Sequence, residues 1–379
     1  MDADEVRERL RAVEDPDLGE DIVSAGLVND VAVEDGVASV SLKLGAPYAP
    51  NESAIADRVR EVLAEAGLEA DLSAAVPRDD TDVLPDVKNV IAVASGKGGV
   101  GKSTVAVNLA AGLADRGARV GLFDADVYGP NVPRMVAADE GPRTTDDEQL
   151  VPPERFGVKL MSMDFLVGED DPVIWRGPMV HKVITQLVED VVWGQLDYLV
   201  VDLPPGTGDT QLTLLQTVPL DGAVVVTTPQ EVALDDARKG LEMFGRHETP
   251  VLGIVENMST FVCPECGTEH DVFGAGGGER FADEQELPFL GSVPLDPAVR
   301  TGGDSGEPVV LGEGATADAF RGMVARVADN VGLLNRRALA EAGNGPEGEP
   351  APGTASGADG GNRPPATEGS RNPGSGPGR

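Results

Sequence analysis

The spacing of apolar residues predicts a small mixed α/β domain at the N-terminal end of the chain. Apolar side chains recur at helical spacing over residues 6–13 and again over residues 51–66. Between these segments they alternate over residues 31–44, on both sides of Asp35-Gly36, a pair of residues typical of a hairpin turn. A helix, a hairpin and a second helix therefore predict one domain over residues 1–75.

A second and larger domain is predicted over residues 89–335, after a polar linker at 76–88 that contains two prolines. Its strand-length segments are continuous apolar runs, as expected for a parallel sheet that is covered on both faces. Helical segments fall between them, for example at residues 179–192 and 234–246. This pattern predicts a doubly wound α/β domain with a mostly parallel sheet. The predicted strands are Val90–Ala94, Val120–Asp124, Tyr198–Asp202, Ala223–Thr227, Val251–Val255 and Phe289–Val293.

Composition limits what the rest of the chain can be. No Val, Ile, Leu, Met or aromatic residue follows Leu339, so residues 340–379 predict a disordered C-terminal tail. The formal net charge of −35 disfavours nucleic acid and anionic membranes as partners, because both attract Lys and Arg. A surface this acidic also predicts a fold that depends on salt, which screens the repulsion between carboxylates.

The sequence also predicts where the protein resides. The first ten residues are charged and amphipathic, unlike a signal peptide, and no apolar run approaches the length of about 18 residues that a membrane span requires. The two cysteines, at 263 and 266, are not the framework of a secreted disulfide-rich protein. We therefore expect a cytoplasmic protein.

The segment after the first strand of the larger domain is rich in glycine and permits two interpretations. Three glycines over residues 96–101 match a dinucleotide-binding turn, with Asp124 as the acid at the end of the next strand. The pattern Gly96-x4-Gly101-Lys102-Ser103 matches a P-loop, whose backbone N–H groups surround phosphate oxygens. In a P-loop, Lys102 would reach the β- and γ-phosphates and the Ser103 hydroxyl would ligate Mg²⁺. The residues predicted to surround the phosphates are Gly96, Lys97, Gly98, Gly99, Val100, Gly101, Lys102, Ser103 and Thr104.

Acidic residues further along the chain favour the P-loop. A dinucleotide-binding fold has no use for Lys102-Ser103 or for a second carboxylate at Asp126. Asp202 follows another apolar strand and begins the segment DLPPGTGD, in the place of an acid on the Mg²⁺ side and a loop that senses the γ-phosphate. In that loop Gly206 would offer its backbone N–H to the γ-phosphate. The sequence therefore predicts a nucleoside triphosphatase rather than a dinucleotide oxidoreductase.

Cys263 and Cys266 have the spacing of metal ligands in a loop after the predicted strand 251–255. Two thiolates form half of a tetrahedral site, and two copies of the chain would supply four, enough for a bridging [4Fe–4S] cluster. A zinc site, with His270 as a third ligand or with four thiolates across a dimer, is one alternative. A redox disulfide is another.

The pattern KGGVGKST, residues 97–104, resembles that of the deviant-P-loop ATPases. The resemblance implies an ATP-dependent homodimer in which Lys97 acts on the nucleotide of the partner subunit, alongside Lys102. It also implies that Asp126 orients the attacking water and that Asp202 lies on the Mg²⁺ side. Asn257 matches the asparagine that contacts adenine in that family, although a cap at the end of a strand is an alternative role.

The full set of motifs resembles the Mrp/ApbC iron–sulfur carrier ATPases over residues 88–335. Residues 1–75 resemble the small SufT-like iron–sulfur assembly domain. That domain often carries a cysteine where this chain has Gly45–Pro50, so we expect the small domain to dock rather than to bind a cluster. The resemblance implies a carrier that hydrolyses ATP and transfers a [4Fe–4S] cluster to apo iron–sulfur client proteins. The motifs that carry it are KGGVGKST, DADVYGPN, WRGPMV (Trp175–Val180), DLPPGTGD, ENMS and CPxCG, with VEDPDLG and VSAGLV in the small domain.

A partition or positioning ATPase with structural zinc at the cysteine pair is the alternative function. Such a protein would need a basic surface for DNA or an amphipathic helix for a membrane. The acidic composition and the tail, which lacks large apolar residues, supply neither.

Overall fold

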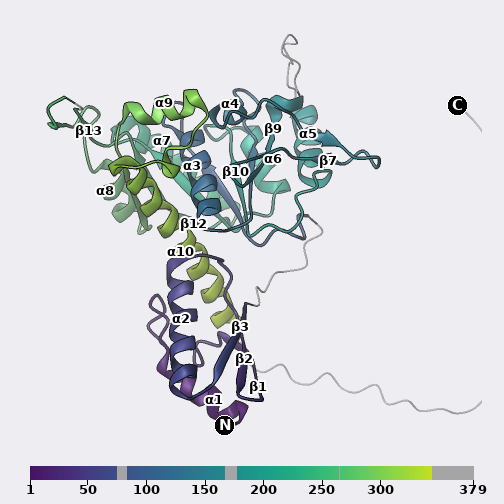
Figure 1. Ribbon diagram of the computed structural model, residues 1–379. Coiled ribbons are helices and arrows are strands. Elements are labelled where there is room, and N and C mark those ends of the chain that lie inside the picture. The colour runs from purple at the N-terminus through teal and green to yellow at the C-terminus, as the bar shows by residue number, and fades with distance from the viewer. Residues whose placement is uncertain (75–82, 167–176, 264, 344–379) are drawn as a thin grey trace, which may run out of the picture. The chain divides into compact units, whose positions relative to one another are not determined.

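The larger domain is built on an eight-stranded sheet with helices on both faces (Figure 1). The computed structural model describes residues 1–74, 83–166, 177–263 and 265–343. The strand order is β15-β12-β11-β4-β10-β5-β9-β8, and neighbouring strands are parallel except for β8 and β9. The prediction of a doubly wound, mostly parallel sheet is confirmed. Its strands are β4 (Val90–Ala94), β5 (Val120–Asp124), β8 (Glu154–Arg155), β9 (Val158–Ser162), β10 (Tyr198–Asp202), β11 (Gly222–Thr227), β12 (Val251–Asn257) and β15 (Phe289–Val293).

Alternate residues of the central strands contribute to two hydrophobic cores, one on each face of the sheet. On β4, Ile91 and Val93 join one core, whereas Val90 and Ala92 join the other. Because neither face is left to solvent, the strands contain continuous apolar runs. The first core includes helices α3 (Lys102–Asp115), α4 (Val132–Met135) and α10 (Ala315–Gly343), and the second includes α5 (Gly177–Glu189), α6 (Asp209–Thr217), α7 (Glu231–Arg246) and α8 (Gly277–Glu284). The remaining elements of this domain are β6 (Arg143–Thr144), β7 (Leu150–Val151), η2 (Met163–Leu166), β13 (Phe261–Val262), β14 (Glu269–His270), α9 (Pro297–Ser305) and η3 (Val309–Leu311).

The predicted linker and the predicted C-terminal tail each include residues that belong to the folded domain. In the predicted linker, Leu84 and Val87 are buried in the second core, and Val87 forms a β-bridge with Leu196. These side chains belong to the larger domain because they extend its apolar layer beyond the first strand. Helix α10 continues to Gly343, so the first residues of the predicted tail are helical. Residues 344–379 lie outside the described part of the chain.

The small N-terminal domain contains a three-stranded sheet, in the order β1-β2-β3, and the predicted hairpin joins its first two strands. Asp35 and Gly36 both have positive φ, at 48° and 86°, as a tight hairpin turn requires. The third strand was not predicted and pairs with β2 in parallel. The elements are α1 (Ala3–Arg9), η1 (Leu10–Ala12), β1 (Val28–Glu34), β2 (Val37–Leu42), α2 (Pro50–Glu65) and β3 (Glu69–Ala74).

Helix α10 connects the larger domain to the small one, where it packs against α2 (Figure 1). Its Arg336 is 0% exposed and forms ion pairs with three carboxylates of the small domain. The shortest distances are 2.6 Å to Asp15, 2.5 Å to Asp17 and 2.9 Å to Glu52. The two aspartates belong to the motif VEDPDLG, so this motif anchors the C-terminal helix.

The loop at Gly45–Pro50, which lacks the cysteine, lies against the larger domain. The Tyr198 hydroxyl donates to the carbonyl of Pro47 at 2.8 Å, and the Asn89 amide donates to that of Gly45, also at 2.8 Å. Ala46 is fully buried in the first core of the larger domain. These contacts join the small domain to the larger one.

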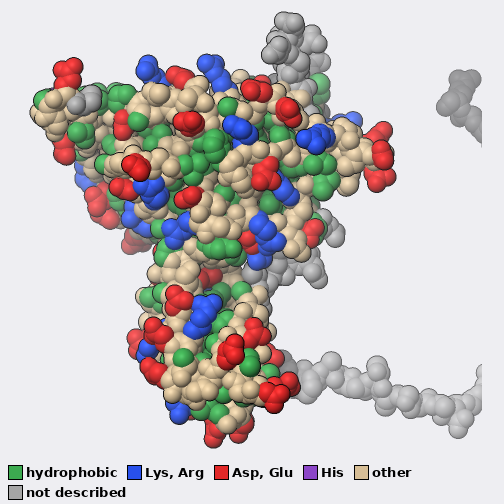
Figure 2. Space-filling model, in the orientation of Figure 1, with side chains coloured by type: hydrophobic (Ala, Val, Ile, Leu, Met, Phe, Trp, Pro, Cys, Tyr) green, Lys and Arg blue, Asp and Glu red, His purple; other side chains and the backbone are tan. Residues whose placement is uncertain are grey.

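Acidic side chains are spread over the visible surface of both domains (Figure 2). Such a distribution follows from the net charge of −35. Among the described residues, no helix is both long and apolar enough to cross a membrane.

Candidate functional site

The glycine-rich loop joins the end of β4 to the start of α3, and its glycines are required for two reasons. Gly101 caps α3 with φ at 88°, a left-handed conformation that glycine adopts readily. At Gly96 a Cβ atom would lie 2.2 Å from the main chain of Asp236 in α7. The loop therefore packs closely against α7 and directs the N-terminus of α3 toward the space where an anion would bind.

Lys102 and Asp202 form a buried ion pair at the base of this loop. The Lys102 ammonium lies 2.7 Å from Asp202 Oδ1 and 3.3 Å from the Ser103 hydroxyl. The other oxygen of Asp202, Oδ2, is buried and has no hydrogen-bond partner within the described residues. A hydroxyl beside a carboxylate oxygen that lacks a partner is a donor set that suits Mg²⁺, which prefers oxygen ligands.

Asp124 lies opposite Asp202 on the neighbouring strand and forms part of the same acidic site. Burial raises the pKa of the Asp124 carboxyl to about 7, and the Asp202 carboxylate adds to the rise. The Ser162 hydroxyl at the end of β9 donates to it at 2.9 Å. The sequence had assigned Asp124 only to the rejected dinucleotide interpretation. The sequence did contain a signal for this pairing: Asp124 and Asp202 both end apolar strands, and the carboxyl ends of parallel strands lie at the same edge of the sheet.

Asp126 and Gly206 hold the loops on either side of the acidic pair. Asp126 Oδ1 accepts hydrogen bonds from the backbone N–H groups of Tyr128 at 3.1 Å and Gly129 at 3.2 Å. Gly206, with φ at 92°, donates its N–H to the carbonyl of Ser95 at 3.0 Å. A phosphate contact by this N–H would therefore require the bond to Ser95 to open.

Lys97 differs from Lys102 because none of the described residues pairs with its charge. Its backbone carbonyl accepts a hydrogen bond from the Ser95 hydroxyl at 3.0 Å, which fixes its main chain. Its side chain is half-buried, and the described part of the subunit provides no ion pair or hydrogen bond to its ammonium. The charge is thus available to a group from outside the subunit.

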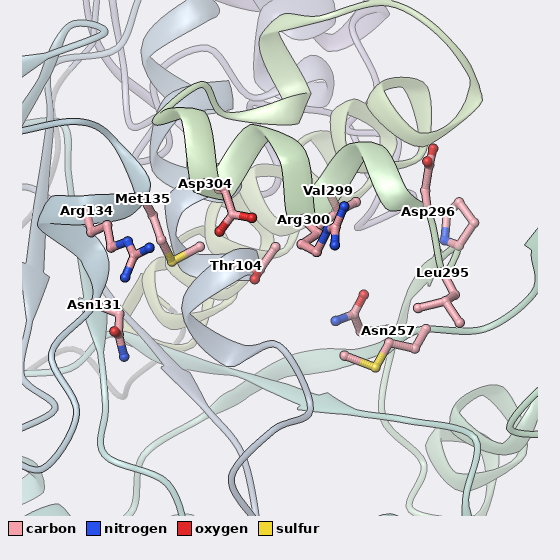
Figure 3. A pocket seen from close by; sticks show the side chains of 13 residues that line it. Thr104, Asn131, Arg134, Met135, Asn257, Leu295, Asp296, Val299, Arg300 and Asp304 are labelled. Carbon is pink, nitrogen blue, oxygen red and sulfur yellow. The ribbon is translucent and has the colours of Figure 1, made fainter.

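A pocket of about 410 Å³ lies beside the first turn of α3 (Figure 3). Asn257, at the end of β12, faces this pocket and donates its side-chain N–H to the carbonyl of Val100 at 2.8 Å. Residues 294–304 supply much of the remaining lining, and the sequence did not predict them because no motif marks them. The lining residues are Thr104, Asn131, Arg134, Met135, Asn257, Met258, Pro294, Leu295, Asp296, Val299, Arg300, Gly303 and Asp304.

The two cysteines lie in a short hairpin, formed by β13 and β14, that projects from the sheet beyond α8 (Figure 1). The Cys263 N–H donates to the carbonyl of Thr268 at 3.0 Å, and the Gly267 N–H donates to that of Cys263 at 2.8 Å. Cys263 is half-buried and Cys266 is exposed. Hydrogen bonds with the side chain and backbone of Thr268, and with Cys263, lower the pKa of the Cys266 thiol and so favour the thiolate.

Within the described residues of one subunit, the two cysteines are not joined by further side chains that could complete a metal site. His270 packs against the ring of Phe261, with ring centroids 6.3 Å apart. In the described ranges, no three or more His, Cys, Asp or Glu side chains are grouped so that they could hold a metal ion. The arrangement therefore gives no support to a zinc site within one chain that uses His270. Trp175 and Arg176 of the motif WRGPMV lie outside the described residues.

Comparisons with known proteins agree with the motifs. The profile of the family described as "NUBPL iron-transfer P-loop NTPase" matches residues 86–330, and that of "Iron-sulfur cluster assembly protein" matches residues 3–76. The "Iron-sulfur cluster carrier protein" of Synechocystis sp. is 47% identical over 350 residues, which cover 88% of this chain and 99% of the relative. The protein of the same name from Escherichia coli is 49% identical over 246 residues, covering 65% of this chain and 66% of the relative.

A solved structure supports the same grouping. The nucleotide-binding protein from Archaeoglobus fulgidus, in complex with ADP, matches with a TM-score of 0.53 at 39% identity. The match covers 59% of this chain and 88% of that protein. Together with the family profiles, these similarities confirm the resemblance inferred from the motifs. The chain belongs to the family of iron–sulfur cluster carrier proteins, P-loop NTPases that here carry an N-terminal iron–sulfur assembly domain.

Proposed function

We propose that this chain works as a cytoplasmic homodimer that hydrolyses ATP and carries a [4Fe–4S] cluster between its two subunits for transfer to apo iron–sulfur proteins. The observation that carries the proposal is the hairpin with Cys263 and Cys266. These two accessible thiols are the only cysteines in the sequence. Since a [4Fe–4S] cluster takes four thiolates, one chain supplies half of the ligands and a second copy supplies the rest.

ATP would bind across the loop and the neighbouring pocket. Its phosphates would lie over residues 96–101, at the N-terminus of α3, and its nucleoside would enter the pocket beside Asn257. Lys102 would exchange its present partner, Asp202, for the β- and γ-phosphates. Ser103 and Asp202 would hold Mg²⁺, which when bound would offset the charge of the phosphates.

Hydrolysis would require Asp126 and a lysine from the second subunit. Asp126 lies on the loop after β5, near Asp202: burial raises the pKa of the Asp202 carboxyl, and the charge of Asp126 adds to the rise. Water would approach the γ-phosphate from the side of Asp126. Lys97 would cross the dimer interface and stabilise the charge that develops on the phosphoryl group. The absence of a partner for its ammonium within the described ranges supports this role.

Exposed apolar side chains follow the strand ends on the nucleotide side and support dimerisation through that face. Tyr128 follows β5 and is 72% exposed, and Val232 follows β11 and is 66% exposed. Phe273, after the cysteine hairpin, is 36% exposed. A second copy packed on this face would bury these side chains and bring Lys97 and the cysteine hairpins of both subunits toward one another.

Transfer would proceed by exchange of thiolate ligands. Each client thiol would give up its proton as it binds iron, and each carrier thiolate would take up a proton as it leaves. No net oxidation or reduction is needed. The exposure of Cys266 would let a client thiol approach.

Anaerobic reconstitution with ferrous iron and sulfide tests the proposal. The wild-type chain should gain a visible thiolate-to-iron absorbance band and about two iron atoms per chain, because one four-iron cluster serves two chains. Cys263→Ala and Cys266→Ala should each abolish the band. Glu265→Ala, which changes the same loop without removing a thiol, should retain it. Stoichiometric zinc with no visible band would instead favour the zinc alternative.

A further inference from the structure

The cysteine hairpin is connected to the nucleotide site through two neighbouring residues at the end of β12. Asn257 contacts the P-loop through its hydrogen bond to the carbonyl of Val100, and a Cβ on Gly101 would lie only 2.0 Å from its Nδ2. Glu256, the residue before it, points to the segment where the chain leaves the hairpin. The end of β12 therefore touches both the nucleotide loop and the hairpin exit.

Glu256 binds the hairpin exit through backbone N–H groups. It is only 1% exposed, and Oε2 accepts a hydrogen bond from the Gly278 N–H at 2.6 Å. Oε1 accepts a second one from the Gly276 N–H at 3.3 Å. Both donors belong to the start of α8, where a carboxylate is stabilised by the N–H groups and by the helix dipole.

Three consecutive glycines permit this close attachment. Gly276 has φ at 66°, in the left-handed region. At Gly277 a Cβ would lie 2.5 Å from the carbonyl oxygen of Pro229, and at Gly278 it would lie 2.8 Å from Cβ of Glu256. The hairpin exit is thus packed against the ends of β11 and β12, and neither Gly277 nor Gly278 leaves space for a side chain.

We propose that Glu256 is a positioning residue that transmits changes at the nucleotide site to the two cysteines. This inference rests on the proposed function, because it requires nucleotide to engage Asn257. When the base takes the Asn257 amide, the bond to Val100 is released and the end of β12 adjusts. Glu256 carries that adjustment to Gly276–Gly278, and so changes the position of the hairpin that holds Cys263 and Cys266.

The test measures thiol accessibility in the full chain without a cluster. Cys263 and Cys266 are alkylated anaerobically after reduction, with and without Mg-ADP, and rates are read by mass spectrometry. In the wild type, ADP should change the alkylation rate by at least about fivefold, the lower end of common coupling between sites. In Glu256→Gln, ADP should still bind but its effect on the rate should disappear.

Glu52→Gln is the matched control. Glu52, in the small domain, is also a buried carboxylate, and it accepts hydrogen bonds from the N–H groups of Gly45 and Ala46. This variant should keep the ADP effect, whatever its loss of stability. A Glu256→Gln variant that binds ADP and retains the full effect would overturn the proposal.

A second measurement covers the case in which Glu256→Gln does not fold. Hydrogen exchange of the wild-type peptide that contains Gly276–Gly278 should change on ADP binding, and unchanged exchange there would contradict the inference. Cluster assembly in the reconstitution experiment is independent of both readouts. A carrier that assembles its cluster but shows no ADP effect would therefore disprove only the role of Glu256.

Discussion

Three charged residues near the P-loop have different surroundings, and these surroundings assign them different tasks. Lys102 is buried and paired with Asp202, so its charge is already held where phosphate would bind. Asp124 is buried beside that same carboxylate. Lys97 is half-buried, and within the described residues its ammonium has no partner. Loss of each side chain should therefore affect a different measurable property.

Lys97→Ala should lower the rate of ATP hydrolysis by about 10²–10³-fold, the cost of removing one group that stabilises transition-state charge. Affinity for ADP should stay close to that of the wild type, because Lys102 and the loop N–H groups remain. Steady-state turnover and calorimetric ADP binding measure the two effects separately. Lys239→Ala, an exposed site on α7, should change neither. Undiminished turnover in Lys97→Ala would contradict a role for Lys97 across the dimer.

Asp124→Asn should stabilise the metal-free protein more at pH 8 than at pH 5. The pKa of Asp124 is about 7 in the folded protein against an ordinary 3.8, so the folded state holds a proton that the unfolded state releases. The free energy of unfolding of the wild type therefore falls as the pH rises from about 4 to about 7, by about 1.4 kcal/mol for each pH unit. Asparagine does not titrate and avoids this loss. Urea denaturation in EDTA at both pH values measures the free energy of unfolding of each protein. A difference between Asp124→Asn and the wild type that is the same at pH 5 and pH 8 would contradict the prediction.

At the scale of elements, strands made of uninterrupted apolar runs could be predicted, whereas β9 and β3, which lack such a run, could not. The central strands are uninterrupted apolar runs, so their limits followed from the sequence. Strand β9 was missed because Lys159 interrupts it, its ammonium reaching the carbonyl of Trp193. Strand β3 was missed because it lies at an edge and is largely exposed.

The site shows the same division between local and distant information. The P-loop and Asp202 were predicted because each belongs to a local motif with its own physical reason. The pocket wall at residues 294–304 comes from a loop and helix after β15, and only the folded sheet brings it to Thr104. Contacts such as that of Glu256 with Gly278 have no local pattern.

Arg336→Ala should destabilise the protein by about 3–5 kcal/mol, because removing one partner leaves the buried carboxylates of Asp15 and Glu52 uncompensated. The loss should be largest in the small domain, which α10 would no longer anchor. Urea denaturation gives the magnitude, and hydrogen exchange over residues 1–65 gives the location. Arg337→Ala, the exposed neighbour, should stay within about 0.5 kcal/mol of the wild type. Equal stability of the two variants would contradict the anchoring role of Arg336.

At the scale of the whole molecule, net charge and domain docking oppose each other. The formal charge of −35 favours expansion, whereas the Arg336 cluster and the loop at Gly45–Pro50 hold the small domain against the larger one. Salt weakens the repulsion between exposed carboxylates much more than it weakens a buried ion pair. Ionic strength should therefore govern the stability of the folded chain.

The melting temperature should rise as salt increases from about 0.01 M to about 1 M, over which the Debye length falls from about 30 Å to about 3 Å. Circular dichroism at a series of KCl concentrations measures the change. Sucrose at matched osmolality controls for effects that do not depend on charge. A melting curve and a folded signal that do not change on desalting would contradict this reading of the acidic surface.

The central claim is that each subunit contributes two of the four thiolates that hold one cluster. Native mass spectrometry of the reconstituted protein, kept anaerobic, measures this most directly, because it reports chain number and bound mass in one spectrum. The account predicts a species of two chains with one [4Fe–4S] cluster. Cys266→Ala should lose both the cluster and this dimeric species. A cluster retained on single chains, or a dimer whose only bound metal is zinc, would contradict it.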